Sequence, residues 1–318
     1  MRAIVVESGQ AVLRDEPQPV PDKGEVLVKV HLAGICGSDL EILKGYGSFE
    51  GILGHEFVGS VVSGSSTLSG KRVVAEINCV CGRCDMCSAG LSNHCRRRTV
   101  LGISGRPGVF AEFVAVPERN CNEVPDSVGD EEAVFTEPLA AAYQIIRQVK
   151  IESRMNVAVV GTGRLGLLAA QVLALTGCRL IAVGRNKKTL AYLDRRRIRT
   201  VVVNEFSQFG DHDLVVDCTG SAEGLAFALK LARPRGKVVM KTTCSSKTDI
   251  DLTPLVVNEV TVLGSRCGPF GDALGALARK QIDVASMITC RMPLSEGVEA
   301  LRLAADPEHI KILLKVSA

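Results

Sequence analysis

The sequence is poor in aromatic residues and contains no long apolar run. Its 318 residues include no tryptophan, and aromatic residues make up 4% of the chain, so few aromatic side chains can line a ligand pocket. No stretch reaches the roughly 20 apolar residues that span a bilayer, and the apolar run in the N-terminal MRAIVVESGQ is too short for a secretory signal. The net charge of +3 does not indicate a nucleic-acid or membrane partner. We therefore expect a cytoplasmic protein.

The length of the chain favours two domains, because it exceeds what a single hydrophobic core usually needs. In residues 1–140, short Val- and Ile-rich runs are separated by Gly, Pro, Ser and Asp, a pattern typical of β-strands joined by turns. In residues 141–270, apolar runs alternate with segments of helical spacing, which predicts a parallel sheet covered by helices. Residues 271–318 hold a further helix and the strand IKILLKVS, which we expect to return to the first domain.

A glycine-rich turn follows the first apolar run of the second region. Residues 157–160, VAVV, lead directly into GTGRLG and a segment of helical spacing. In a dinucleotide site the first glycine makes the tight turn, the second lets the backbone approach a pyrophosphate, and the third allows the helix to pack closely. The expected cofactor-binding residues in this turn are Gly161, Gly163, Arg164, Leu165 and Gly166.

The end of the next strand indicates which dinucleotide binds. NAD sites carry an acidic residue there, about 20 residues further on, which accepts hydrogen bonds from the ribose. This chain has Gly184 followed by Arg185 and Asn186, so the carboxylate is missing and an arginine is available for the 2′-phosphate of NADP(H). The alternative is that Arg185 and the lysines after it form the solvated start of a helix. We expect NADP(H).

Four closely spaced cysteines predict a structural zinc site. They follow the pattern C-x2-C-x2-C-x7-C within a lobe expected over residues 79–98, and they are Cys81, Cys84, Cys87 and Cys95. Four thiolates in one short lobe match the closed tetrahedral ligand set of structural zinc. An iron–sulfur cluster uses similar ligands and is the alternative. Cys79 is a fifth cysteine that we expect to lie outside the site.

A second, dispersed set of donors suits a metal ion with one open coordination position. It offers one thiolate, one imidazole and one or two carboxylates, from Cys36, His55, Glu56 and Glu137. Catalytic zinc sites use three protein ligands of these types and leave the fourth position to water or substrate. Taken singly, each residue has a structural alternative: a buried cysteine, a core histidine or a glutamate at a helix start.

The combination of motifs resembles a known family. GICGSDL, GHEFVG, CGRCDMC, EPLA and GTGRLG, in this order, are similar to motifs of the zinc-containing medium-chain dehydrogenases, the alcohol dehydrogenase superfamily, and the polyol, threonine and glucose dehydrogenase branch looks nearest. The resemblance implies an α/β protein with a GroES-like β-rich catalytic domain and a Rossmann domain with a doubly wound parallel sheet. It implies hydride transfer between an alcohol or carbonyl substrate and NADP(H), two zinc ions per chain, and a homodimer or homotetramer.

The resemblance also assigns roles to single residues. Cys36 and His55 match two ligands of the catalytic zinc, and either Glu56 or Glu137 would be the third. The hydroxyl that contacts the alcohol would be that of Ser38, the carboxylate that orients His55 would be that of Asp39, and Glu41 stands where many relatives have a relay histidine. Further residues implied along the cofactor groove are Thr219, Thr242, Arg266 and, near the pyrophosphate, Lys311.

Two rival interpretations remain at this point. One is a non-catalytic NADPH-binding sensor or scaffold that has kept the fold, because a fold does not by itself confer a function. The other is a zinc-free reductase. The intact set of Cys36, His55 and Glu137 argues against the first rival, and the four-cysteine lobe argues against the second.

Overall fold

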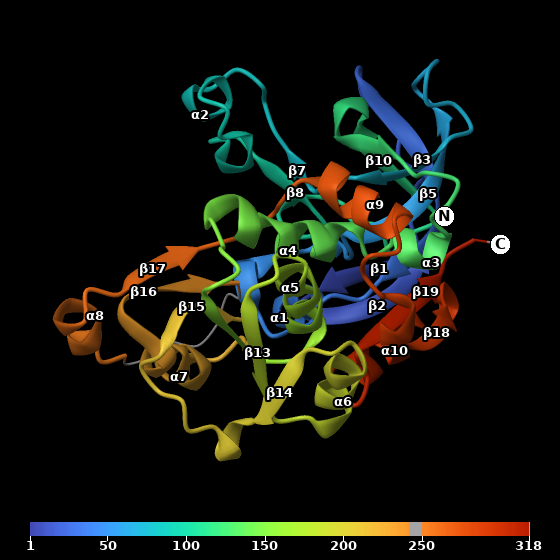
Figure 1. Ribbon diagram of the computed structural model, residues 1–318. Helices are drawn as coiled ribbons and strands as arrows, with labels where there is room; N and C mark the ends of the chain where they lie inside the picture. The colour runs from blue at the N-terminus through green and yellow to red at the C-terminus, as the bar shows by residue number, and fades with distance from the viewer. Residues whose placement is uncertain (242–249, 318) are drawn as a thin grey trace. The chain divides into compact units, whose positions relative to one another are not determined.

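Residues 1–241 and 250–317 are described in a computed structural model of the chain (Figure 1). The chain divides into two units, one made of Met1–Glu137 with Phe270–Ala318 and the other of Pro138–Pro269. The sequence led us to expect boundaries at 140/141 and 270/271, and the structure has them at 137/138 and 269/270. Among the described residues, no helix combines the length and the apolar character needed to cross a membrane.

Unit 1 is built around a seven-stranded sheet with the long strand β3 (Glu25–Gly34) in its middle. This strand is rich in valine and pairs antiparallel with strands from distant parts of the chain, namely β5 (Glu56–Ser63), β10 (Phe113–Pro117) and the C-terminal β19 (Lys311–Lys315). Residues near both ends of the sequence therefore share one sheet. Its other strands are β6 (Arg72–Ala75), β11 (Cys121–Glu123) and β18 (Ile288–Pro293).

Two small sheets and several short helices complete unit 1. One sheet contains β1 (Arg2–Glu7), β2 (Gln10–Asp15) and β4 (Gly51–Ile52), and the other contains β7 (Asn78–Cys79), β8 (Thr99–Leu101) and β9 (Gly105–Arg106). The helices are α1 (Gly37–Leu43), α2 (Asp85–Ser88), α3 (Asp130–Ala133), α9 (Phe270–Ala278) and α10 (Gly297–Ala304).

Unit 2 contains a six-stranded parallel sheet in the order β14–β13–β12–β15–β16–β17. Counted along the chain this order is 3-2-1-4-5-6, which is that of a Rossmann sheet. The strands are β12 (Asn156–Val160), β13 (Arg179–Gly184), β14 (Arg199–Val202), β15 (His212–Asp217), β16 (Ala232–Met240) and β17 (Thr261–Gly264). The accompanying helices are α4 (Thr136–Gln148), which begins at the end of unit 1, α5 (Arg164–Ala174), α6 (Lys187–Arg195), α7 (Ala222–Leu231) and α8 (Thr253–Val257).

The expected α/β fold class is confirmed, with one strand missed. The apolar runs predicted as strands correspond to β12, β13, β15, β16 and β17. Strand β14 was not expected, because its sequence RTVV follows a run of arginines and none of its residues is fully buried. It lies at the edge of the sheet beside β13, where a strand needs a less continuous apolar face.

Candidate functional site

A thiol, an imidazole and a carboxylate meet at one end of two paired strands in unit 1. Gly34, the last residue of β3, pairs with Glu56, the first residue of β5, so the residues just outside this pair are close in space. Cys36 follows β3 and His55 precedes β5. The donor atoms of Cys36, His55 and Glu56 all lie within 4.8 Å of one another. This donor set fits a catalytic zinc ion, which prefers thiolate, imidazole and carboxylate ligands.

Asp39 connects two of these residues. It lies in the first turn of α1, where its Oδ2 accepts a hydrogen bond of 2.8 Å from the backbone N–H of Cys36. Its Oδ1 faces the Nδ1 atom of His55 at 3.2 Å, although the alignment leaves both atoms without a well-formed hydrogen bond. A carboxylate on Nδ1 leaves Nε2 of the imidazole available for a metal ion.

The neighbours of His55 change the pKa of its imidazole. Burial opposes the imidazolium form, but the charge of Asp39 and its contact with the ring, together with Cys36, raise the pKa of His55 well above its usual value. The side chains of Asp39 and His55 are 0% and 3% exposed. A ring held in this way cannot turn toward solvent, so its position is preset.

Glu56 forms a buried ion pair with Lys311. The ammonium of Lys311 contacts Glu56 Oε2 and donates a hydrogen bond of 3.3 Å to the carbonyl of Ile35. Both side chains are at most 2% exposed. The expectation that Lys311 lies near the cofactor pyrophosphate stays a prediction; in unit 1, β19 returns to the sheet beside β3 and turns this side chain toward Glu56. A Cβ at Gly34 would lie 2.6 Å from Glu56 Oε2, so glycine makes room for the pair.

The other expected catalytic residues lie at different places in unit 1. Ser38 is half-buried on α1, with its hydroxyl 3.8 Å from the Cys36 sulfur. Glu41 follows on the same helix and forms an ion pair of 2.9 Å with Lys44. Glu137 lies in the first turn of α4 and is half-buried, and among the described residues the cluster of donors does not include it. Glu56 is the carboxylate that the described residues bring to this set.

The four cysteines of the lobe form a second cluster of donors. Cys81, Cys84, Cys87 and Cys95 offer sulfur atoms within 4.8 Å of one another. Sulfur–sulfur distances of 3.5, 3.5 and 3.8 Å join Cys84 to Cys87, Cys95 to Cys81 and Cys84 to Cys95. A tetrahedron with Zn–S bonds of about 2.3 Å has S–S edges of about 3.8 Å, so the geometry fits zinc.

The backbone of the lobe stabilises thiolate at one cysteine in particular. Hydrogen bonds from the backbone at Arg96 and Cys87 lower the pKa of Cys84 to about 6. Burial, together with contacts to Cys84 and Cys95, raises the pKa of Cys87 to about 11. Because thiolate is the form that binds a metal, Cys84 is already prepared for this role.

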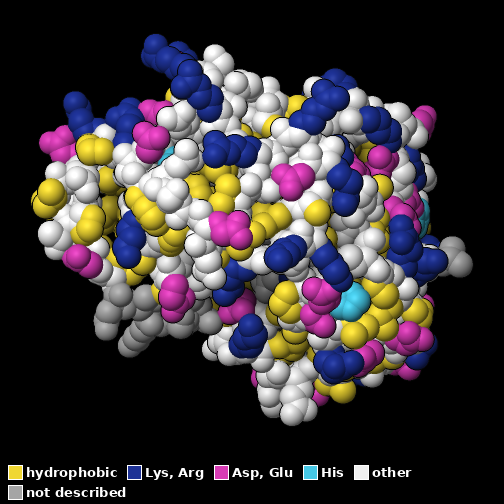
Figure 2. Space-filling model, turned by 60° about the horizontal axis from the view of Figure 1, so that its bottom comes forward, with side chains coloured by type: hydrophobic (Ala, Val, Ile, Leu, Met, Phe, Trp, Pro, Cys, Tyr) yellow, Lys and Arg dark blue, Asp and Glu magenta, His cyan; other side chains and the backbone are white. Residues whose placement is uncertain are grey.

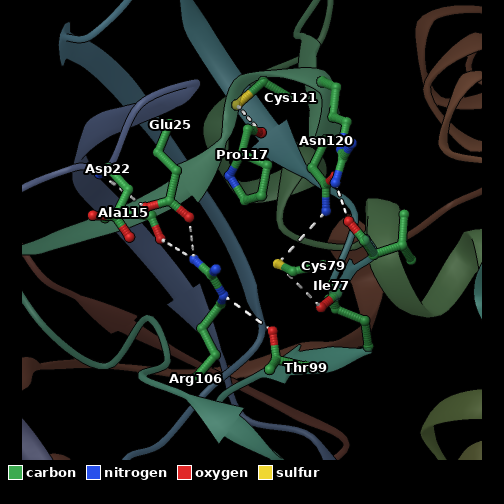
Figure 3. A network of polar contacts seen from close by, with 12 residues as sticks. Asp22, Glu25, Ile77, Cys79, Thr99, Arg106, Ala115, Pro117, Asn120 and Cys121 are labelled. Carbon is green, nitrogen blue, oxygen red and sulfur yellow. Dashed lines mark hydrogen bonds and ion pairs between the residues drawn. The ribbon is translucent and has the colours of Figure 1, made fainter. Parts of the chain in front are cut away.

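A polar network joins the base of the lobe to the rest of unit 1 (Figure 3). Arg106 forms an ion pair of 2.7 Å with Glu25 and donates to the hydroxyl of Thr99, thereby linking β9 and β8 to β3. The amide of Asn120 donates to the carbonyls of residues 76 and 78 and lies 3.8 Å from the sulfur of Cys79. Cys79 is buried within this network and outside the cluster of four cysteines, as expected.

The glycine-rich turn of unit 2 has the geometry that a dinucleotide requires. Gly161 adopts a positive φ of 91°, and a Cβ there would lie 2.9 Å from the backbone of Cys218. A Cβ at Gly166 would lie 1.8 Å from the carbonyl oxygen of Gly161, so only glycine lets α5 pack this close. Gly163 caps α5 and has nothing within 4 Å of an added Cβ. The N-terminus of a helix is the end that binds a phosphate in dinucleotide sites, and Gly163 stands at that end of α5.

The end of β13 lies next to this turn. Gly184 is buried, while Arg185 is exposed. Asn186 is the N-cap of α6, and its side-chain oxygen accepts a hydrogen bond of 2.8 Å from the N–H of Lys188. That oxygen therefore serves the helix, a role the sequence did not suggest. Arg164 is the first residue of α5, and Leu165 follows it in the first turn of that helix.

The remaining residues expected to bind the cofactor lie in different surroundings. Thr219 follows β15 beside Gly161, and its hydroxyl donates to Asp217 at 2.7 Å. Arg266 is exposed beyond the end of β17, and its carbonyl accepts a hydrogen bond of 2.9 Å from the buried Lys241. Thr242 lies outside the described residues. Lys241 was missed by the sequence reasoning, because a lysine at the end of a strand carries no motif.

Comparisons with known proteins identify the family. Residues 22–126 match the alcohol dehydrogenase GroES-like domain, and residues 165–280 match the zinc-binding dehydrogenase family. The chain is 29% identical over 330 residues to a sorbitol dehydrogenase of Halalkalibacterium halodurans, with 96% of each chain covered. It is 30% identical to a D-arabitol-phosphate dehydrogenase of Enterococcus avium, over 94% of this chain and 91% of that one.

Solved structures agree with these matches over the whole chain. A zinc-binding dehydrogenase from Sinorhizobium meliloti bound to NADP is 30% identical and superimposes with a TM-score of 0.89, covering 99% of each chain. An alcohol dehydrogenase from Escherichia coli in complex with NADH is 28% identical, with a TM-score of 0.90 and the same coverage. The GroES-like and Rossmann folds are thereby confirmed, and the chain belongs to the zinc-containing medium-chain dehydrogenases of the alcohol dehydrogenase superfamily and is an oxidoreductase.

Proposed function

We propose that the chain is a zinc-dependent dehydrogenase that interconverts an alcohol and a carbonyl compound with NADP(H). The observation that carries this proposal is the cluster of Cys36, which is half-buried, with the buried His55 and Glu56 beside Asp39. A sensor or scaffold without catalysis has no use for such a donor set, so that alternative is not favoured. Relatives that act on sorbitol and D-arabitol phosphate favour a polyol-like substrate.

Each residue in and around the cluster has its own role in the proposed reaction. Cys36, His55 and Glu56 would hold a zinc ion, which would supply Lewis acidity to a substrate oxygen, and bound nicotinamide would supply the hydride chemistry. Asp39 keeps the imidazole of His55 in one orientation. Ser38 accepts the proton of the alcohol and passes it outward. Glu41 lies three residues further along α1, on the same face of the helix, which suits a step of this proton route toward solvent.

The preference for NADP(H) rests on the end of β13. Gly184 offers no carboxylate to the ribose hydroxyls, and the exposed Arg185 is free of the protein core and able to reach a 2′-phosphate. Arginine suits this task because its planar fork donates paired hydrogen bonds to phosphate. The relative from Sinorhizobium meliloti was solved with NADP, whereas that from Escherichia coli was solved with NADH, so the family allows both.

We propose two kinds of partner for the chain: a small-molecule substrate and further copies of the chain itself. On the face shown in Figure 2, Lys and Arg side chains are interspersed with Asp and Glu. Nucleic-acid-binding proteins instead gather basic side chains into a continuous patch or stripe. The mixed pattern on this face accordingly favours a soluble small substrate.

The first expected result concerns the choice of cofactor. Initial rates with a polyol panel should give a higher kcat/KM with NADP(H) than with NAD(H), and Arg185→Ile should remove most of the difference. Charge-assisted contacts contribute about 1.5–3 kcal/mol each, which is roughly 10- to 150-fold in binding. The matched control is Lys187→Ile, which removes a neighbouring exposed charge from the start of α6. Equal or better efficiency of the wild type with NAD(H) would contradict the preference.

The second expected result is a content of two zinc ions per chain. Elemental analysis of the purified protein should find about two equivalents, and Cys81→Ser should leave about one, because a structural site needs all four thiolates. Cys79→Ser should keep both ions, since Cys79 lies outside the cluster of four. A wild-type content of one zinc would remove one of the two sites from the proposal.

The third expected result concerns association of the chain with itself. Within the described part of unit 2, β17 has a strand neighbour only on the β16 side, and Val262 on it is 38% exposed. Leu252, Val256 and Val257 nearby in sequence are 61–79% exposed. A free apolar edge of this kind pairs readily with a second copy across a two-fold axis.

Light scattering at micromolar concentration should therefore give a dimer or tetramer. Val262→Lys should shift it toward the monomer, because a charged side chain on an edge strand opposes pairing. Val298→Lys is the control, since Val298 is exposed to a similar degree, 41%, but lies on α10 in unit 1. A wild type that is a stable monomer would refute self-association.

A further inference from the structure

The end of β13 has no room for a side chain at position 184. A Cβ on Gly184 would lie 2.2 Å from Thr162 Oγ1 and 2.9 Å from Thr162 Cγ2. The backbone of Gly184 is not in the left-handed region, so its conformation would accept other residues. What demands glycine here is therefore the side chain of Thr162, which occupies the space that a Cβ would need.

Thr162 is held in place on several sides. It lies in the turn after β12, and the N–H of the preceding Gly161 donates a hydrogen bond of 2.9 Å to the carbonyl of Val183. This bond fastens the turn to the end of β13. The side chain of Thr162 is 5% exposed, so it has no free solvent space into which to turn. A short, buried side chain cannot yield to a neighbour as the end of a long flexible one can.

A chain of hydroxyl groups fixes the rotamer. Thr189 Oγ1 donates to the carbonyl of Asn186 at 2.9 Å, which uses its only proton. The 2.7 Å contact between the two threonine hydroxyls must then have Thr162 as donor and Thr189 as acceptor. Thr189 is 3% exposed, so a rotation of Thr162 would leave a buried hydroxyl without its partner. The same chain holds the backbone of Asn186, next to Arg185.

We propose that Thr162 is a specificity-determining residue for the cofactor, because it excludes every side chain from position 184. The exclusion removes the carboxylate that an NAD site places at this point, and with it the repulsion of a 2′-phosphate. A side chain at position 184 therefore requires a smaller residue at position 162. This inference rests on the proposed preference for NADP(H), and it adds the residue that enforces it.

The test is a double-mutant cycle at the two positions. Gly184→Ala should lower the urea midpoint of unfolding in the wild-type background and have little effect in a Thr162→Gly background, where the space is open. Thr162→Ala should be intermediate, because the Thr162 Cβ would still lie 3.1 Å from a Cβ at 184. Gly264→Ala is the control: this glycine also ends a strand of the sheet, and nothing lies within 4 Å of its added Cβ.

The second part of the test measures cofactor binding by variants with aspartate at position 184, through titration of the fluorescence of NADPH and NADH. Gly184→Asp alone should weaken binding of both by about tenfold or more, because the turn must deform. Thr162→Gly combined with Gly184→Asp should recover NADH binding and leave NADPH weaker than NADH, with a change in their ratio of about tenfold or more. If Gly184→Asp alone binds NADH well and unfolds like the wild type, Thr162 excludes nothing and the inference is overturned.

The outcomes separate this inference from the proposed function. Equal binding of NADPH and NADH by the wild type would overturn the cofactor preference and the role of Thr162 in it, even if the unfolding cycle shows coupling between the two positions. A preference for NADPH without coupling in the cycle would keep the proposed function and overturn the role of Thr162. Coupling together with a recovered NADH affinity in the double variant supports both.

Discussion

Cys36→Ala and His55→Ala should each lower kcat/KM by about 10³-fold or more while leaving the affinity for NADPH within about twofold of the wild type. Polarisation of a substrate oxygen contributes several kcal/mol to the transition state, and each 1.36 kcal/mol is tenfold in rate. The donors concerned lie in unit 1, whereas the glycine-rich turn that fits the dinucleotide lies in unit 2. Steady-state rates and a fluorescence titration of NADPH measure the two effects separately.

The matched control for this pair is Cys290→Ala. Cys290 is a half-buried cysteine of unit 1 on β18 and belongs to neither cluster of donors. Its replacement should cost stability at most and leave turnover near that of the wild type. If His55→Ala kept near-normal activity, zinc-dependent catalysis at this site would be wrong.

The second large effect is expected from Lys311→Met, which removes the ammonium that pairs with the buried carboxylate of Glu56. Removal of one partner from a buried ion pair typically destabilises a protein by about 3–5 kcal/mol. The Ile35 carbonyl loses a donor in the same substitution. Urea unfolding of the purified variant should therefore show a markedly lower midpoint than that of the wild type.

Two further variants separate charge from packing at this pair. Glu56→Gln combined with Lys311→Met removes both charges and should recover part of the lost stability, because no ion then remains buried alone. Lys280→Met breaks the pair with Glu132, whose members are 55% and 22% exposed, and should cost about 1 kcal/mol or less. A loss at Lys311→Met as small as that at Lys280→Met would show that the buried pair does not stabilise unit 1.

Much of the candidate site could be predicted from the sequence because its parts are local. The four cysteines of the lobe lie within 15 consecutive residues, so their spacing alone brings them together. The glycine-rich turn is a continuous strand–turn–helix, in which an added Cβ at Gly161 would meet the backbone of Cys218 and one at Gly166 would meet the carbonyl of Gly161. For the dispersed set, Cys36, His55 and Glu56 are each embedded in a short motif, which made them recognisable through family resemblance.

Only the tertiary structure decided the contacts made across long separations in the chain. Lys311 meets Glu56, 255 residues away, because the C-terminal strand pairs with β3. Glu137 stays outside the donor cluster although its motif suggested otherwise. The short distance between Thr162 and a Cβ at Gly184 likewise arises only where the turn after β12 packs against the end of β13.

Local motifs could be predicted and long-range contacts could not, because a motif is a property of a short segment whereas packing depends on several segments together. A motif records which residue types a piece of chain needs, and the sequence therefore determined the family, the fold class and the four sulfur donors of the lobe. The partner of a buried charge and the space around a Cβ depend on which segments the sheets bring together and how closely they pack. Those facts depend on the whole chain. At Gly184, for example, the hydroxyl of Thr162, from the turn after β12, occupies the space that a side chain would need.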